Sequence, residues 1–102
     1  MAADADVQVW LDTLERTRPG AVVPYVISEE SRELRYRVRA VQEGHGGRAV
    51  IGQTGTVHVF ASTPAPLSLL SLNPRQGGFC EIEVVLNGVG MKEIRYVFEC
   101  PS

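Results

Sequence analysis

Apolar and basic residues alternate strictly in the middle of the chain. The basic residues are Arg35, Arg37 and Arg39, and the apolar residues that separate and flank them are Leu34, Tyr36, Val38 and Ala40. A period of two places the arginines on one face of a strand and the apolar side chains on the other. Residues 34–41 therefore predict a β-strand with one buried face, and a fold built around a sheet.

Further strands are expected along the rest of the chain. The segments with strand-like composition or alternation are 7–12, 21–28, 48–53, 56–61, 79–86 and 94–100. Gly52 and Gly55 indicate a bend or a bulge between two strands, and Pro24 suggests an edge strand or a bulge. Residues 67–72 fit either a buried strand or a helical turn. Seven or eight short strands favour an all-β sandwich, with an eight-stranded barrel as the competitor.

The length and composition fit one small globular domain. The chain has 102 residues, 44% of them hydrophobic, and a net charge of −2, which excludes a basic protein that coats nucleic acid. No apolar run reaches the ~20 residues of a membrane helix. We expect residues 1–6 to be a disordered stub and residues 7–102 to form a single domain. Residues 1–6 contain no signal peptide; they fit equally a cytosolic start or the remnant of signal cleavage.

The sequence offers no motif for catalysis or for binding a metal ion. His45 and His58 lie thirteen positions apart, and neither cysteine has a closely spaced partner ligand. Glu81 and Glu83 are expected on the outward face of a strand, where solvated acids are common. No nucleophile elbow or phosphate loop is present. We therefore expect neither an enzyme nor a cofactor.

Cys80 and Cys100 fall on the two strands of an expected hairpin whose loop contains Asn87 and Gly88. A register that opposes Leu86 to Ile94 also opposes the two cysteines. A disulfide there would be structural and would suit an oxidising compartment. The alternative is a pair of separate buried thiols.

The three alternating arginines are the strongest departure from ordinary composition, because nine of the ten basic residues in the chain are arginine. Arginine donates forked hydrogen bonds and stacks on amides and rings, so such a row suits a partner rich in carboxylates and amides. The plainer interpretation is a solvated face whose charges form weak surface ion pairs. The candidate acids for those pairs are Glu81, Glu83, Glu93 and Glu99.

Four segments together resemble the curli assembly chaperones of the CsgH type, relatives of CsgC. They are LRYRVRAVQEGHGG at 34–47, IGQTGTV at 51–57, PLS at 66–68 and FCEI at 79–82. The resemblance spans roughly residues 7–100. It implies an immunoglobulin-like sandwich in the periplasm that inhibits premature amyloid formation by an unfolded curli subunit through transient, charge-guided contact. CsgC-type members carry a Cys-X-Cys pair that this chain lacks, so a redox role finds no support in the motif.

In this interpretation the chain acts as a monomer without cofactor, nucleic acid or membrane insertion. The client would be held by Arg35, Arg37 and Arg39, with Lys92 and Arg95 extending the surface if the last strand is adjacent. Two other functions remain open from the sequence. One is a passive interaction module of the cell envelope with a folded partner, and the other is a thiol-disulfide carrier that uses Cys80 and Cys100.

Overall fold

The computed structural model describes the whole chain except residues 1–6, 15–17, 19, 45, 73–77 and 102, so the expected stub at 1–6 lies outside the described residues. The described residues form eight strands and no helix. The strands are β1 (Val7–Thr13), β2 (Ala21–Ser28), β3 (Arg32–Gly44), β4 (Gly47–Val59), β5 (Ala65–Pro66), β6 (Leu70–Ser71), β7 (Phe79–Gly88) and β8 (Met91–Glu99). The predicted all-β class is confirmed. Nowhere in the described part is there a helix long and apolar enough to cross a membrane.

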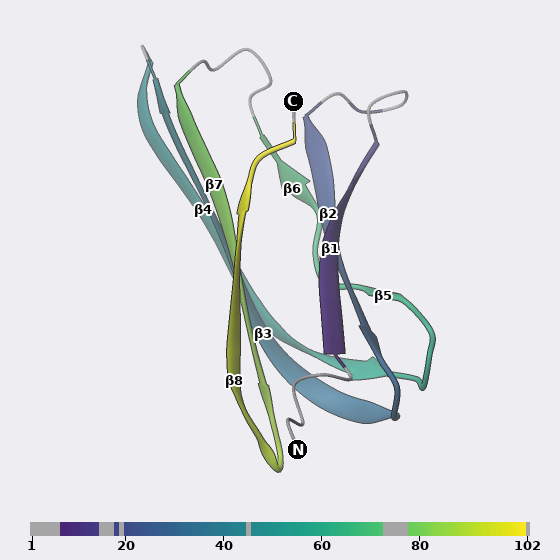
Figure 1. The fold of residues 1–102 in the computed structure, drawn as a ribbon. Helices are drawn as coiled ribbons and strands as arrows, with labels where there is room; N and C mark the ends of the chain where they lie inside the picture. The colour runs from purple at the N-terminus through teal and green to yellow at the C-terminus, as the bar shows by residue number, and fades with distance from the viewer. Residues whose placement is uncertain (1–6, 15–17, 19, 45, 73–77, 102) are drawn as a thin grey trace.

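The strands form two antiparallel sheets that face each other as a sandwich (Figure 1). One sheet has the order β4-β3-β7-β8. In the other, β2 pairs with β1 on one side and with the short β5 and β6 on the other. The long strands β3 and β4 curve across the width of the molecule (Figure 1). The first sheet carries the arginine row.

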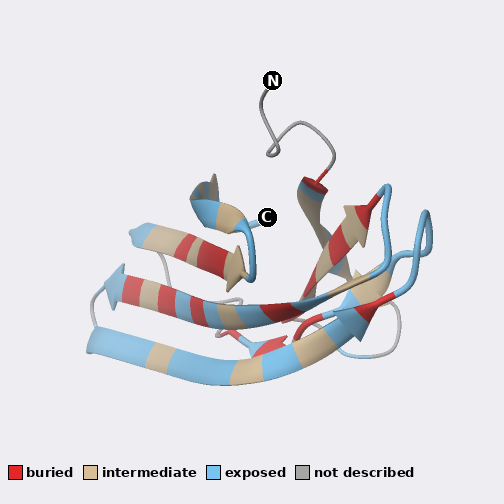
Figure 2. Cartoon of the chain, turned by 90° about the horizontal axis from the view of Figure 1, so that it is seen from below, coloured by how far each residue is buried: buried red, intermediate tan, exposed pale blue. Residues whose placement is uncertain are grey.

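The core lies between the sheets and follows the period of two. Leu34, Val38 and Ala40 on β3 are fully buried, and Ile82, Val84 and Leu86 on β7 lie beside them. The opposing sheet contributes Val22, Val26 and Leu70. The buried and exposed bands along β3 are visible in Figure 2. This burial fixes the strand register, because a slip by one residue would bring the arginines into the core.

The expected break between residues 48–53 and 56–61 is wrong, because one continuous strand, β4, runs from Gly47 to Val59. β4 pairs with β3 through thirteen consecutive residues without a register shift. Gly55 faces Tyr36 of β3, and the Tyr36 ring lies over it: a Cβ at Gly55 would approach Tyr36 Oη to 2.7 Å. The glycine therefore makes room for an aromatic side chain and leaves the strand unbroken.

Gly55→Ala is expected to lower the free energy of unfolding by about 1–3 kcal/mol, the usual cost of overpacking, because Tyr36 packs against the core and must move. Gly52→Ala is the matched control, since a Cβ there meets nothing within 4 Å. It should leave stability unchanged or raise it by ~0.4–1 kcal/mol. Urea unfolding measures both, and equal effects would contradict the role given to Tyr36.

The expectation for Pro24 is also wrong in part, because β2 is the central strand of its sheet. Leu11 faces Pro24 on one side. On the other side β5 pairs with residues 25–26 and β6 with residues 21–22, so Pro24 lies at the gap between them. The Pro24 carbonyl accepts a 2.9 Å hydrogen bond from the Leu67 amide within the connecting segment. A central strand accommodates proline where its neighbour is interrupted.

Candidate functional site

Arg35, Arg37 and Arg39 lie on the outward face of β3, and all three are exposed. β3 is the second strand of its sheet, between β4 and β7. The residues that face the row across β4 are Thr56, Thr54 and Gly52, and those that face it across β7 are Asn87, Val85 and Glu83. The arginines thus form one column with small or neutral neighbours at five of these six positions.

Glu83 is the one acid directly opposite the row, across from Arg39. Its carboxylate is engaged elsewhere: the Arg95 Nε–H of β8 donates to Glu83 Oε2. A second ion pair joins Arg48 to Glu43 at 3.2 Å. None of the three guanidinium groups forms an ion pair with a described carboxylate. Arg95 therefore fits the plainer interpretation, in which surface ion pairs neutralise the arginines. The charges of Arg35, Arg37 and Arg39 are not neutralised in this way by a described carboxylate.

The charge environment of Glu83 reflects this arrangement. The hydrogen bond from Arg95 lowers the pKa of Glu83 below its ordinary value, and partial burial of the carboxylate opposes the shift. The positive charges of Arg95, Arg37 and Arg39 act in the same direction as the hydrogen bond. Glu83 therefore stays ionised at neutral and mildly acidic pH, and it balances one charge of the surrounding cluster.

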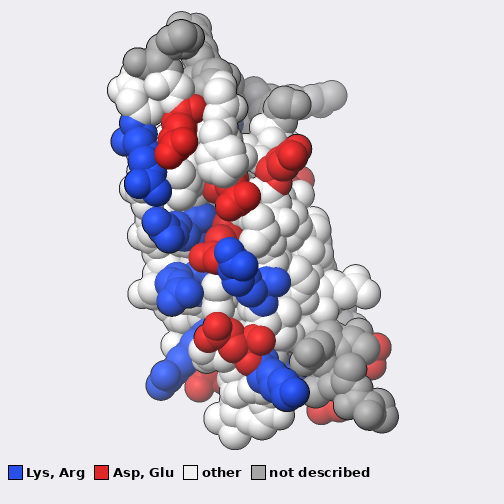
Figure 3. Space-filling model, turned by 60° about the vertical axis from the view of Figure 1, so that its left-hand side comes forward, with Lys and Arg blue, Asp and Glu red and all other residues white. Residues whose placement is uncertain are grey.

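Acidic residues border the row on the β7 and β8 side. Val41 faces Glu81, and Glu81 faces Glu99 on β8. Together with Arg39, Glu83 and Arg95, residues Val41 and Glu81 line a shallow hollow of about 90 Å³. Basic and acidic side chains gather on one side of the molecule in Figure 3. The surface is thus a basic column with an acidic margin and no enclosed ligand cavity at this place.

The sequence-based extension of the row through Lys92 and Arg95 required the last strand to be adjacent, and it is not. β7 lies between β3 and β8. Arg95 shares the outward face but is paired with Glu83. Lys92 is exposed at the start of β8, where the register shifts between Leu86 and Gly88. We therefore restrict the candidate site to Arg35, Arg37 and Arg39.

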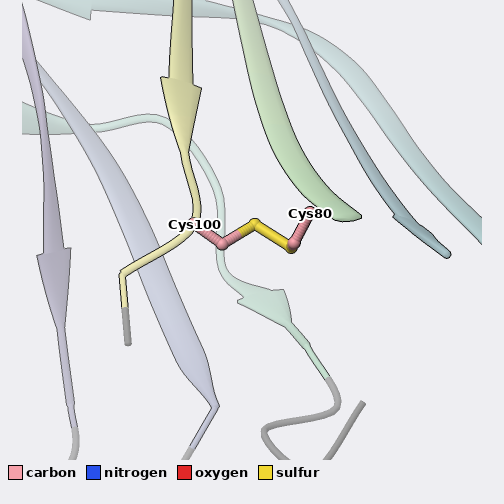
Figure 4. The surroundings of a disulfide bond; sticks show 2 residues. All are labelled: Cys80 and Cys100. Carbon is pink, nitrogen blue, oxygen red and sulfur yellow. A yellow bond between two sulfur atoms is a disulfide. The ribbon is translucent and has the colours of Figure 1, made fainter. Parts of the chain in front are cut away.

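Cys80 and Cys100 form a disulfide that joins the start of β7 to the end of β8 (Figure 4). Their Cα atoms are 5.5 Å apart, and the Cys100 amide donates to the Cys80 carbonyl at 3.3 Å. Leu86 faces Ile94 as the disulfide register requires. Both cysteines are partly buried and pack against the core. This position indicates a structural disulfide that holds two neighbouring strands together.

The histidines and acids of the described residues form no cluster of three that could hold a metal ion. His58 lies on β4 against Phe60, with ring centroids 4.8 Å apart. His45 lies outside the described residues. His58 faces Glu33 of β3, so it lies on the same outward face as the row, next to its Arg35 end.

Sequence reasoning missed two features of this surface. The Glu83–Arg95 pair joins the two strands of the predicted hairpin, and its signal was the opposite charge of two residues that this register brings close together. The other feature is the free edge of β4 beside the arginine row. Gly44 and Gly47, which face each other across the turn, are the sequence signal for one long hairpin.

Comparison with known proteins identifies the fold. No family model and no curated protein matches the sequence. Two solved structures match over nearly the whole chain. The curli protein CsgC of E. coli matches with a TM-score of 0.69 and 19% identity, over 90% of this chain and 97% of that one. The solution structure of CsgH from R. palustris matches with a TM-score of 0.68 and 14% identity, over 91% of both chains. The chain therefore has the fold of the curli proteins CsgC and CsgH, as its sequence resemblance predicted.

Proposed function

We propose that the chain is a curli-associated periplasmic chaperone that delays amyloid formation by an unfolded curli-type subunit. The observation that carries the proposal is the row of three exposed arginines without an ion pair to a described carboxylate. A folded surface that leaves like charges side by side incurs a standing repulsion, about 0.6 kcal/mol for two charges ~7 Å apart in water before screening. A partner with carboxylates and amides would relieve that repulsion.

The fold and the disulfide support this proposal from two other directions. One of the two matched structures, CsgC of E. coli, is described as a curli protein, so a curli-associated role fits the fold. A structural disulfide persists in an oxidising compartment such as the periplasm. The chain would act by binding alone, as a single copy without catalysis or cofactor. Contact through exposed charges is weak and exchanges rapidly, which suits a client that must later be released.

A fibril-formation time course tests the proposal. A purified curli-type subunit is followed with an amyloid dye, alone and with the chain at substoichiometric ratio. We expect a longer lag, and we expect added salt to shorten it again, because exposed charges are screened beyond ~8–10 Å near physiological ionic strength. A globular protein of similar size and net charge is the control. An unchanged lag at equimolar ratio would refute the proposal, and a stable complex with a folded partner would favour a passive interaction module.

A further inference from the structure

β4 is the longest edge strand in the described structure, and it lacks the usual protection of an edge. It stands at the end of the order β4-β3-β7-β8, and no described strand pairs with its outer side. Its thirteen residues include no proline, no register shift and a single charged residue, Arg48. Natural edge strands are protected by short length, charge, proline or bulges. β4 therefore presents an open row of backbone donors and acceptors.

The other edges are protected. β8 has a register shift near its start and carries Lys92, Glu93, Arg95 and Glu99. β1 has seven residues, and its Val7 carbonyl accepts a 3.2 Å hydrogen bond from Tyr96 Oη. β5 and β6 have two residues each. Among the described strands, β4 is the edge that best fits an added strand.

The hydrogen-bond pattern shows which backbone groups of β4 face outward. In an antiparallel sheet successive residues direct their N–H and C=O groups to opposite neighbours. The Cys100 amide bonds the Cys80 carbonyl, so even-numbered residues of β7 bond β8 and odd-numbered residues bond β3. Odd-numbered residues of β7 face odd-numbered residues of β3, so the even-numbered residues of β3 bond β4. These face the odd-numbered residues of β4, so the N–H and C=O groups of the even-numbered residues of β4 point away from the sheet. The central ones are Val50, Gly52, Thr54 and Thr56.

The arginine row lies on the same outward face, one strand inside this edge. Gly52, Thr54 and Thr56 face Arg39, Arg37 and Arg35. They are small, and a Cβ at Gly52 would meet nothing within 4 Å. Strands are ~4.8 Å apart, so an added strand would lie ~10 Å from β3. Long arginine side chains crossing β4 and acidic side chains on the added strand can meet over that distance.

We propose that β4 is a strand-addition site for an extended polypeptide segment with acidic side chains at alternate positions. The added backbone bonds the even-numbered residues of β4, while its acidic side chains contact the arginine row. This assignment rests on the proposed function and deepens it, because it names the segment of a client that is held. Main-chain hydrogen bonds supply affinity, and the arginines select the charge pattern. A client strand on β4 also has one of its two edges occupied, so it cannot offer that edge to another client chain.

The first experiment uses a capped nine-residue peptide that alternates Glu and Thr, with a matched peptide that has Lys in place of Glu. Amide hydrogen exchange of the isotope-labelled chain is followed by NMR. We expect the Glu peptide to slow exchange at the amides of Val50, Gly52, Thr54 and Thr56, while odd-numbered β4 amides, already bonded to β3, change little. The Lys peptide should have no effect. Protection on β8, or equal protection by both peptides, would overturn the assignment.

A pair of variants tests whether the β4 edge binds the peptide, this time by changing the protein and keeping the peptide the same. Thr54→Pro removes an outward donor and should abolish peptide binding, whereas Thr54→Ala keeps the N–H and should bind as before. Because Thr54→Pro can also strain the strand, its melting temperature is measured alongside. A Glu peptide N-methylated on every backbone amide leaves the chain untouched and should lose binding. Binding by either Thr54→Pro or the methylated peptide, or a concentration-dependent dimer with protected β4 amides, would contradict the proposal.

The two proposals fail in distinguishable ways. If Thr54→Pro still delays fibrils while the arginine variants described below do not, the chaperone function stands and the strand-addition site is wrong. If the Glu peptide binds β4 but the chain leaves fibril formation unchanged, the site stands and the proposed client is wrong.

Discussion

Replacing Arg35, Arg37 and Arg39 together by glutamate is expected to abolish the delay in fibril formation, so that the lag returns to that of the subunit alone. The three side chains are exposed and the core beneath them is untouched, so the variant should fold. The change converts an attractive surface into a repulsive one for an acidic client. The amyloid-dye time course measures the effect, and circular dichroism checks the fold.

A charge-matched variant separates the row from net charge. Arg18 and Lys92 are exposed cations outside β3, and replacing both by glutamate gives the same change in formal charge as replacing only Arg35 and Arg37. This variant should keep most of the delay. An equal loss in both variants would show that overall charge matters and that the row does not.

Glu83→Gln provides a change of opposite sign, since it removes the acid facing Arg39 and should lengthen the lag at low salt.

Removing the disulfide with Cys80→Ala and Cys100→Ala is expected to lower the free energy of unfolding by about 3 kcal/mol in the chain-entropy model. The bond closes a loop across a sequence separation of 20, and losing it frees the unfolded chain. Urea unfolding measures the difference. Because the pair lies at the end of the β7–β8 hairpin away from the arginine row, the folded variant should still delay fibrils.

Reduction of the unmodified chain is the control for that variant. If the bond itself stabilises the fold, a reductant strong enough to break it should cause the same loss of stability as the double substitution. Unchanged stability after complete reduction would contradict a structural role. Rapid exchange with a mild reductant in the folded state would instead favour the thiol-disulfide carrier.

The sequence was sufficient to predict the all-β class, the outward arginine row and the opposed positions of Cys80 and Cys100. In each case the information is local, because alternation along one strand assigns side chains to faces and a hairpin links its own two strands. The local pattern gave a wrong prediction at Gly52 and Gly55, because two closely spaced glycines resemble the end of one strand and the start of another. The partner that keeps β4 continuous there, Tyr36, comes from another strand. The local pattern failed similarly at Pro24, because the gap between β5 and β6 is a property of the sheet.

Strand order decided the rest of the candidate site. The alternation at residues 34–41 could not show that β7 separates the arginines from Arg95. It also could not show that β4 is an open edge beside the row. The face on which a side chain lies is fixed by the chirality and pleat of its own strand, so it can be predicted from the alternation of residues along the sequence. The neighbours of a strand are fixed by long-range packing of the whole sandwich, and only the tertiary structure contains them.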